Sequence, residues 1–218
     1  MTMIVMAKAP VPGRVKTRLC PPCTPVQAAD LAAAALADTM EAVAAVPALR
    51  HVLAIEGALD LAVPAAFETI AQRGTDLDER LAAAFYDVGG PTLLVGMDTP
   101  QVTTVVLTEA VEALLRRGTG AVLGPAHDGG WWAAGLRRAD PRAFVGVPMS
   151  TPSTRIEQWR RFESLGLHPW ALPPLRDVDE IADALAVATA APHSRFAAQM
   201  ARLELDRLKL DRLDRVEA

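Results

Sequence analysis

Clustered basic side chains follow the first apolar segment of this chain. Residues 3–7 are uncharged and suited to a strand buried on both faces of a parallel sheet, and a loop rich in proline and glycine follows them. Four cations lie in or beside that loop: Lys8, Arg14, Lys16 and Arg18. Because clustered charge raises the local concentration of anions, a strand, a basic loop and a helix in this order favour a phosphate or nucleotide site at the carboxyl edge of an α/β sheet. The alternative is an exposed loop whose cations only keep it soluble.

Acidic side chains occupy positions where a metal ion could be held. Asp98 follows the apolar residues 92–96 and is expected at the carboxyl end of a central strand, where it could bind a divalent cation that offsets the charge of a nucleoside diphosphate. Asp177 and Asp179 alternate with Val178, so an extended chain places both carboxylates on one side, and such close like charges favour a cation between them. The alternatives are local, with Asp98 capping the next turn and the later pair capping the next helix.

The sequence HDGGWW at 127–132 combines an acid, two glycines that allow close backbone approach, and two large rings. Adjacent residues of a strand face opposite ways, so only one of Trp131 and Trp132 can face a cleft and stack on a sugar or a base. The other ring is expected in the core. The lone His127 is more typical of a solvent-facing hydrogen bonder than of a general base.

Segments typical of strands and of helices alternate along the chain and must position these groups. Capping boxes predict helix starts at Thr24, with Gln27, and at Asp76, with Glu79. This alternation predicts an α/β fold. The predicted strands are 3–7, 51–55, 67–71, 92–96, 121–124 and 131–136, and the predicted helices are 26–46, 77–86, 105–117, 155–165 and 181–190.

The composition bounds the class of protein. A chain of 218 residues that is 51% hydrophobic can bury the core of one α/β domain. A formal net charge of −4 and the lack of a long basic tract argue against a nucleic-acid partner. The chain has no lysine-rich start before a long apolar stretch and no segment long enough to span a bilayer, so we expect a soluble cytoplasmic protein without a membrane partner.

Cys20 and Cys23 form a Cys-Pro-Pro-Cys sequence that is typical of redox pairs or of half a zinc site. No second cysteine pair completes tetrahedral coordination, and the two thiols follow a basic loop instead of a redox-type strand. We therefore expect neither metal nor redox chemistry at these thiols.

The composition changes near the end of the chain. Residues 1–190 carry all the patterns described above, whereas 191–218 are charged, with Asp-Arg-Leu recurring, and predict a long amphipathic helix. Its apolar stripe is too wide for a strict two-stranded coiled coil. Three alternatives remain, in which this helix docks on its own domain, docks on a partner subunit in a possible homodimer, or is a frayed tail.

Several blocks of the sequence resemble the DUF2064 family, bacterial proteins grouped with nucleotide-diphospho-sugar transferases of the GT-A fold. The blocks are KAPVPGRVKTRL, DLDERLAAAF, LLVGMDTP, LGPAHDGGWWAAGL and RDVDE, and they occur in the family's order from Met3 to about Val187. The first loop also resembles, less closely, the enzymes that guanylylate phospholactate or phosphoenolpyruvate. The resemblance implies a three-layer α/β/α fold with a mostly parallel sheet, and a metal-dependent transferase with Mg2+ or Mn2+ as cofactor.

The resemblance also implies roles for individual residues. Asp98 would be the signature acid of the GT-A fold, the later acidic pair would face the same metal, Asp128 and its glycines would line the acceptor or sugar side, and Arg80 would start a helix beside the nucleotide. The candidate site then contains catalytic Asp98 and Asp128; metal ligands Asp98, Asp177 and Asp179; nucleotide- or phosphate-binding Lys8, Ala9, Pro10, Gly13, Lys16, Arg18 and Arg80; and an acceptor or sugar pocket with Gly129, Gly130 and Trp131.

These patterns predict an enzyme that transfers a group from a nucleotide-diphospho donor to an unknown small-molecule acceptor. In the leading hypothesis the transferred group is a sugar. The alternatives are a nucleotidyltransferase that releases pyrophosphate and a nucleotide-binding protein without catalytic activity. Departures from the family pattern predict that the pocket differs from that of close relatives. They are Asp78 in place of the usual glycine, Met149 in place of the usual aromatic residue, and Glu180 in place of a frequent threonine.

Overall fold

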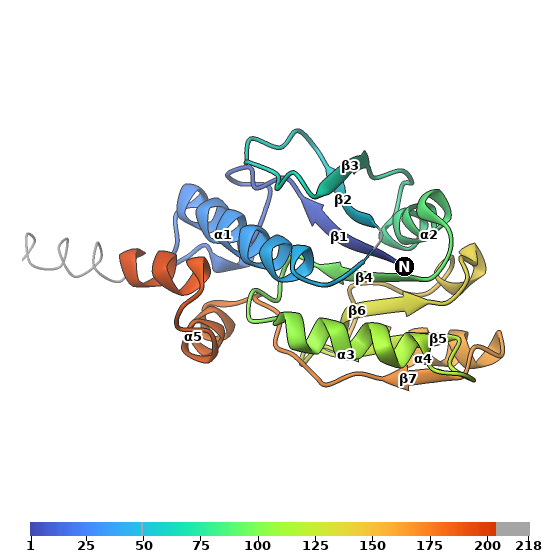
Figure 1. The fold of residues 1–218 in the computed structure, drawn as a ribbon. Helices are drawn as coiled ribbons and strands as arrows, with labels where there is room; N and C mark the ends of the chain where they lie inside the picture. The colour runs from blue at the N-terminus through green and yellow to red at the C-terminus, as the bar shows by residue number, and fades with distance from the viewer. Residues whose placement is uncertain (49, 204–218) are drawn as a thin grey trace, which may run out of the picture.

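A seven-stranded mixed sheet lies at the centre of the protein (Figure 1). The structure is a computed structural model that describes residues 1–48 and 50–203. The strands occur in the order β3-β2-β1-β4-β6-β5-β7, and β6 runs antiparallel to both of its neighbours, whereas the other adjacent pairs are parallel. They are β1 (Thr2–Lys8), β2 (Arg50–Glu56), β3 (Phe67–Ala71), β4 (Thr92–Gly96), β5 (Ala121–Pro125), β6 (Trp131–Leu136) and β7 (Pro169–Ala171).

Helices cover both faces of this sheet. They are α1 (Pro25–Ala44), α2 (Leu77–Val88), α3 (Thr104–Leu115), α4 (Thr154–Ser164) and α5 (Ile181–Ala190), with short 3-10 helices η1 (Thr17–Leu19) and η2 (Pro141–Ala143). Alternate residues of β1 face opposite layers, so Met3 and Val5 pack with α1 and α3, whereas Ile4 and Met6 pack with α2 and α4 (Figure 1). The predicted three-layer α/β/α fold is therefore confirmed. Within the described chain, no helix combines the length and the apolar composition that crossing a membrane requires.

One of the two predicted capping boxes is present. Thr24 Oγ1 accepts a hydrogen bond from the Gln27 backbone N–H, and the Gln27 side chain accepts one from the Thr24 N–H, so the first box is confirmed. The second prediction is wrong. Asp76 occupies the N-cap position of α2 without a capping hydrogen bond, and the Glu79 carboxylate accepts from the N–H of Thr75, one residue before the N-cap.

The short strand β7 has no counterpart among the predicted strands. It has three residues and begins with a proline, which cannot donate to a sheet ladder, so neither length nor pattern marks it as a strand. It pairs in parallel with β5 at the edge of the sheet. The strand therefore carries the chain back to the carboxyl ends of the other parallel strands.

The first part of the C-terminal segment packs on the domain. Residues 195–203 are helical, and Phe196 and Met200 are buried in a cluster with residues of α1 and α5. Docking on the domain is thus the alternative that holds for this part of the predicted 191–218 helix. Residues 204–218, on which the other two alternatives also depend, lie outside the described residues.

Phe196→Ala should destabilise the protein. The side chain is 1% exposed between α1, α5 and its own segment, so its removal leaves a cavity and costs about 3 to 5 kcal/mol of unfolding free energy. Urea denaturation followed by circular dichroism measures the loss. Leu185→Ala, at a position of α5 that is 46% exposed, is the control and should change stability by about 0.5 kcal/mol or less. Equal midpoints for both variants would contradict the docking of this segment.

Candidate active site

The carboxyl ends of the parallel strands meet at one edge of the sheet. Lys8 ends β1, Glu56 ends β2, and Asp98 follows β4. The strands β5 and β7 run in the same direction as β4, so the residues after them reach the same edge. Ligands of open α/β sheets bind at this edge, which makes it the place to look for a site.

Two adjoining cavities open here. The first has a volume of about 310 Å3 and lies against the basic loop and the ends of β1 and β2. The second has a volume of about 640 Å3 and lies between the end of β4, the start of β6 and residues 149–152. Both are lined by Arg18, Met97, Asp98 and Asp179. We treat them as one cleft with two compartments.

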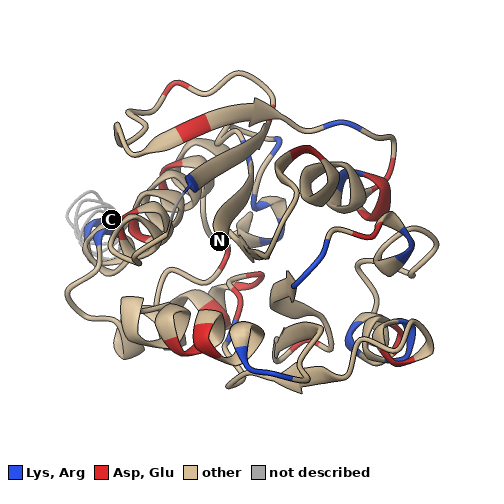
Figure 2. Cartoon of the chain, turned by 45° about the vertical axis from the view of Figure 1, so that its right-hand side comes forward, with Lys and Arg blue, Asp and Glu red and all other residues tan. Residues whose placement is uncertain are grey.

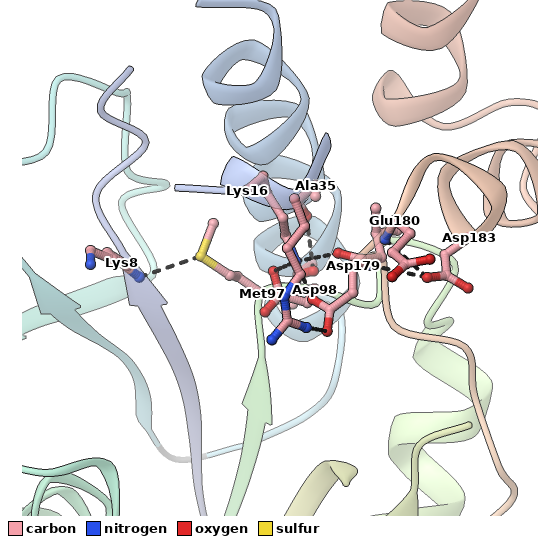
Figure 3. A network of polar contacts seen from close by, with 11 residues as sticks. Lys8, Lys16, Ala35, Met97, Asp98, Asp179, Glu180 and Asp183 are labelled. Carbon is pink, nitrogen blue, oxygen red and sulfur yellow. Dashed lines mark hydrogen bonds and ion pairs between the residues drawn. The ribbon is translucent and has the colours of Figure 1, made fainter. Parts of the chain in front are cut away.

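Lys16 of the basic loop contacts residues that follow β4 and β7 within this cleft (Figure 3). Its ammonium nitrogen lies 2.7 Å from Asp98 Oδ1 and 3.5 Å from Asp179 Oδ1, and it donates to the carbonyl oxygen of Val178. An ammonium group has three donors, so these acceptors satisfy it fully. Arg18 adds a contact of 3.0 Å to the other oxygen of Asp179. The basic loop is thereby bonded to residues 175–179, which follow β7 and which we call the acidic segment.

The surroundings of Lys16 favour its charged form. Its side chain is only 9% exposed, and its backbone has a φ of 50°, a left-handed conformation that is uncommon outside glycine. Burial by itself would lower the pKa of Lys16, but the negative charges of Asp98 and Asp179 outweigh burial and raise the pKa above its usual value. Lys16 therefore keeps its proton, and its ion pairs offset the strain of the loop.

Backbone hydrogen bonds hold the acidic segment across the sheet edge. The Leu175 N–H donates to the carbonyl that ends β5, at 3.0 Å, and the Val178 N–H donates to the Asp98 carbonyl, at 2.9 Å. Val178 is 1% exposed, whereas Asp177 and Asp179 line the cleft. The segment thus has the alternation that its sequence predicts, with the apolar residue inward and both carboxylates on the ligand side.

Two carboxylates of the acidic segment lie close to a third carboxylate, from the turn between β5 and β6. One oxygen each from Asp128, Asp177 and Asp179 lies within 4.8 Å of the others. The Gly130 N–H donates to Asp128 Oδ1 at 2.7 Å and so orients that side chain. Burial, followed by the nearby charge of Asp128, raises the pKa of Asp177 to about 6. The negative charge of the group is therefore not fully offset by the neighbouring cations.

This group fits a hard divalent cation such as Mg2+ or Mn2+. Carboxylate oxygens are the ligands that such ions prefer, and a bound cation would relieve the repulsion from Asp128 that adds to burial in raising the pKa of Asp177. Asp128, Asp177 and Asp179 would hold the ion. The sequence predicts Asp98 as a ligand, but its carboxylate is paired with Lys16 here, and its role as a ligand stays a prediction.

Capping of α5 does not need the two acids of the acidic segment. Glu180 occupies the N-cap position, and Asp183 accepts its N–H at 3.0 Å (Figure 3). Asp183 also pairs with Arg176 at 2.8 Å. The helix start is therefore satisfied by the residues after the acidic pair, and the departure at Glu180 lies in this cap.

The predicted phosphate-binding residues divide into two groups. One group lines the first cavity, and the other shapes the loop without lining either cavity: the first contains Lys8, Lys16, Arg18 and Arg80, and the second contains Ala9, Pro10 and Gly13. Arg14 also lines the first cavity, is exposed, and has no ion-pair partner among the described residues. Elsewhere, basic and acidic residues are scattered over the helices and loops (Figure 2).

The second cavity has an aromatic wall. Trp131 lines it, whereas Trp132 is 2% exposed and packs in the core. Gly130 also lines this cavity. Gly129 has a φ of 95°, and a Cβ there would lie 2.1 Å from the carbonyl oxygen of Pro152. Glycine at 129 is therefore required by the packing of the chain against itself, independently of any ligand.

Two departures from the family pattern lie in different places. Asp78 accepts a hydrogen bond from the Gly146 N–H at 2.8 Å and ties α2 to the loop after η2, without lining either cavity. Met149 lines the second cavity. The first departure therefore keeps its charge out of the cleft, whereas the second changes the wall of the pocket.

The first cavity also contains polar residues that were not predicted as site residues, among them Glu56 and Gln72. Glu56 ends β2, and Gln72 directly follows β3. The signal that could have found them is their position, because polar residues at the carboxyl ends of strands beside the first βα loop face the ligand edge of such a sheet.

Several solved structures share this fold. A candidate nucleotide-diphospho-sugar transferase from Desulfovibrio desulfuricans G20 is 25% identical, with a TM-score of 0.83 over 94% of this chain and 95% of that chain. A cytidylyltransferase from Leptospira borgpetersenii is 12% identical, with a TM-score of 0.53 over 94% of each chain. A mannosyltransferase from Pyrobaculum calidifontis, in complex with GDP-Man and Mn2+, is 12% identical, with a TM-score of 0.52 over 81% of this chain and 56% of that chain.

The fold is thus the one shared by GT-A-like proteins and nucleotidyltransferases. Residues 29–151 match the family model described as "Uncharacterized protein conserved in bacteria (DUF2064)". This match spans more than half of the chain, which belongs to the DUF2064 family, as its sequence blocks predict. No curated protein matches the chain significantly.

Asp177→Asn should change how stability depends on pH. The pKa of about 6 lies above the ordinary 3.8, so between these values the folded protein holds a proton that the unfolded chain has lost. The stability contribution of Asp177 therefore falls as the pH rises through this window. We expect the variant to raise the melting temperature more above pH 6 than below pH 3.8. Thermal melts in matched buffers measure this, with Asp30→Asn on the exposed side of α1 as control. A difference that does not vary with pH would contradict the raised pKa.

Proposed function

We propose that this protein is a metal-dependent transferase whose donor is a nucleotide-diphospho-sugar. The observation that carries the proposal is one cleft that joins the basic loop to three carboxylates suited to a divalent cation. A nucleoside diphosphate needs positive charge on both sides, and the basic loop and a metal ion would supply it. The Pyrobaculum mannosyltransferase, which shares this fold in a complex with GDP-Man and Mn2+, supports this pairing of donor and metal.

The basic side chains of the loop would have two different roles, phosphate binding and positioning of the acidic groups. Arg14 and Arg18 lie on the exposed side of the loop, where charge-assisted hydrogen bonds to phosphate oxygens are possible. Lys16 has its three donors engaged by acceptors of the protein, so we assign it a positioning role for the acidic groups. A divalent cation, when bound, would offset the charge that develops on the leaving phosphate.

The second cavity would hold the transferred sugar and the acceptor. Trp131 offers a ring face of the kind that stacks on sugars. Asp98 lies where the two cavities meet, and Asp128 lies inside the second, so either carboxylate could accept the proton of an acceptor hydroxyl. Met149 replaces a ring that is usual in the family, which would alter the choice of acceptor.

A second candidate function is nucleotidyl transfer. It is favoured by the cytidylyltransferase, which is matched over 94% of its length, whereas the mannosyltransferase is matched over 56%. Both reactions need the same cations. In sugar transfer the bond from the sugar to the diphosphate breaks and a nucleoside diphosphate leaves. In nucleotidyl transfer the acceptor attacks the α-phosphorus of a nucleoside triphosphate and pyrophosphate leaves.

Asp128→Asn should weaken the binding of Mn2+. The substitution removes one charged oxygen from the proposed ligand set, and a lost contact to a charged group costs about 1.5 to 3 kcal/mol, or roughly tenfold or more in affinity. Calorimetric titration of the protein with Mn2+ measures this. Asp60→Asn, at an exposed position away from the cleft, is the matched control. The same affinity in Asp128→Asn and wild type would remove Asp128 from the metal site.

Product analysis should separate the two reactions. With Mn2+ present, we expect nucleotide-diphospho-sugars to release nucleoside diphosphate slowly, with water as the acceptor, and nucleoside triphosphates mixed with sugar phosphates to release no pyrophosphate. Chromatography of the nucleotides measures both products, with Asp128→Asn as the background control. Pyrophosphate release would replace sugar transfer by nucleotidyl transfer. Nucleotide binding without either product would leave a non-catalytic binding protein.

A further inference from the structure

Glu56 is a carboxylate of the first cavity that lies outside the proposed metal group. It ends β2, and its side chain is 38% exposed. Arg80 Nη1 lies 2.7 Å from its Oε2, and Lys8 Nζ lies 4.0 Å from its Oε1. Each carboxylate oxygen has a second lone-pair direction, so both can still accept a hydrogen bond from a ligand.

Arg80 fixes the direction of this carboxylate. Its Nε donates to the Gly74 carbonyl at 3.2 Å, and its Nη2 donates to the Thr75 carbonyl at 3.1 Å. These acceptors hold the planar guanidinium in one orientation. The guanidinium in turn holds the Glu56 carboxylate in one orientation. In this arrangement Arg80 positions the Glu56 carboxylate, and its predicted role in binding nucleotide or phosphate stays a prediction.

Of the polar groups around the Glu56 carboxylate, Gln72 has no N–H left to donate to a ligand. Gln72 Nε2 donates to two backbone carbonyls, at 2.8 Å and 3.0 Å, which uses both of its N–H groups. What this corner of the cavity offers a ligand is therefore a pair of acceptors on Glu56 beside a donor on Lys8. Met6 and Leu77 also line the cavity and supply apolar surface suited to the faces of a planar ring.

We infer that the first cavity binds the guanine base of the donor, an inference that rests on the proposed function. The pairing edge of guanine presents the carbonyl O6 and then two adjacent donors, N1–H and N2–H2. The two oxygens of Glu56 can accept both donors, and Lys8 can donate to O6. Adenine and cytosine place one amino donor beside a ring acceptor, and uracil places one N–H between two carbonyls that would face the carboxylate.

Calorimetric titration of the full chain with nucleoside diphosphates in the presence of Mn2+ tests this inference. We expect wild type to bind GDP about tenfold or more tightly than UDP, and also about tenfold more tightly than inosine diphosphate, which lacks the N2 amino group. Glu56→Gln turns one acceptor into a donor and should lose the preference for GDP while keeping the affinity for UDP. Glu68→Gln, on β3 and paired with Arg50, is the matched control and should keep the preference.

The outcomes separate this inference from the function on which it rests. Equal affinities for GDP and inosine diphosphate, or binding of UDP, ADP or CDP as tight as that of GDP, would overturn the guanine assignment and leave the proposed function in place. No binding of any nucleoside diphosphate would overturn the proposed function. The comparison of GDP with inosine diphosphate uses wild type, so it decides the matter even where Glu56→Gln does not fold.

Discussion

The ion pairs of Lys16 are the interaction on which the arrangement of the site depends. They join the loop after β1 to the segment after β7, two parts of the chain that are distant in sequence. Without this ammonium group, Asp98 would lose its ion-pair partner, and Asp179 would keep only Arg18, at 3.0 Å. The side chains of Asp98 and Asp179 are 44% and 33% exposed, so solvent screens these pairs and their net contribution to stability is small. The pair therefore selects one geometry of the cleft more than it stabilises the fold.

The antiparallel strand β6 explains why Asp128 and Trp131 lie in the same cleft as the acidic segment. After β5 reaches the carboxyl edge, a short turn reverses the chain, and β6 starts at the same edge. A parallel connection would instead have crossed the face of the sheet as a helix before returning. The hairpin keeps Asp128 and Trp131 near the acids that follow β7, so the three grouped carboxylates and an aromatic wall lie in one compartment.

The sequence predicted the parts of this protein that depend on neighbouring residues. The capping box at Thr24 and the inward turn of Val178 follow from spacing alone, and the structure contains both. The sequence failed where distant or competing partners decide. Glu79 bonds to Thr75 instead of completing a capping box, and β7 is too short to leave a pattern. Likewise, no local pattern shows that Arg80 would meet Glu56, since that pair forms only when α2 packs beside β2.

The groups that line the cleft are spread along most of the described chain. The basic loop follows β1, and β2 and β3, whose ends also border the first cavity, come after it. The acidic segment, whose Val178 N–H bonds to the Asp98 carbonyl, comes only after β7. Two of the three grouped carboxylates, Asp177 and Asp179, therefore lie beyond the last strand of the sheet. A chain truncated before Asp177 would therefore contain every strand of the sheet but lack two of the three acids that the proposed metal site needs.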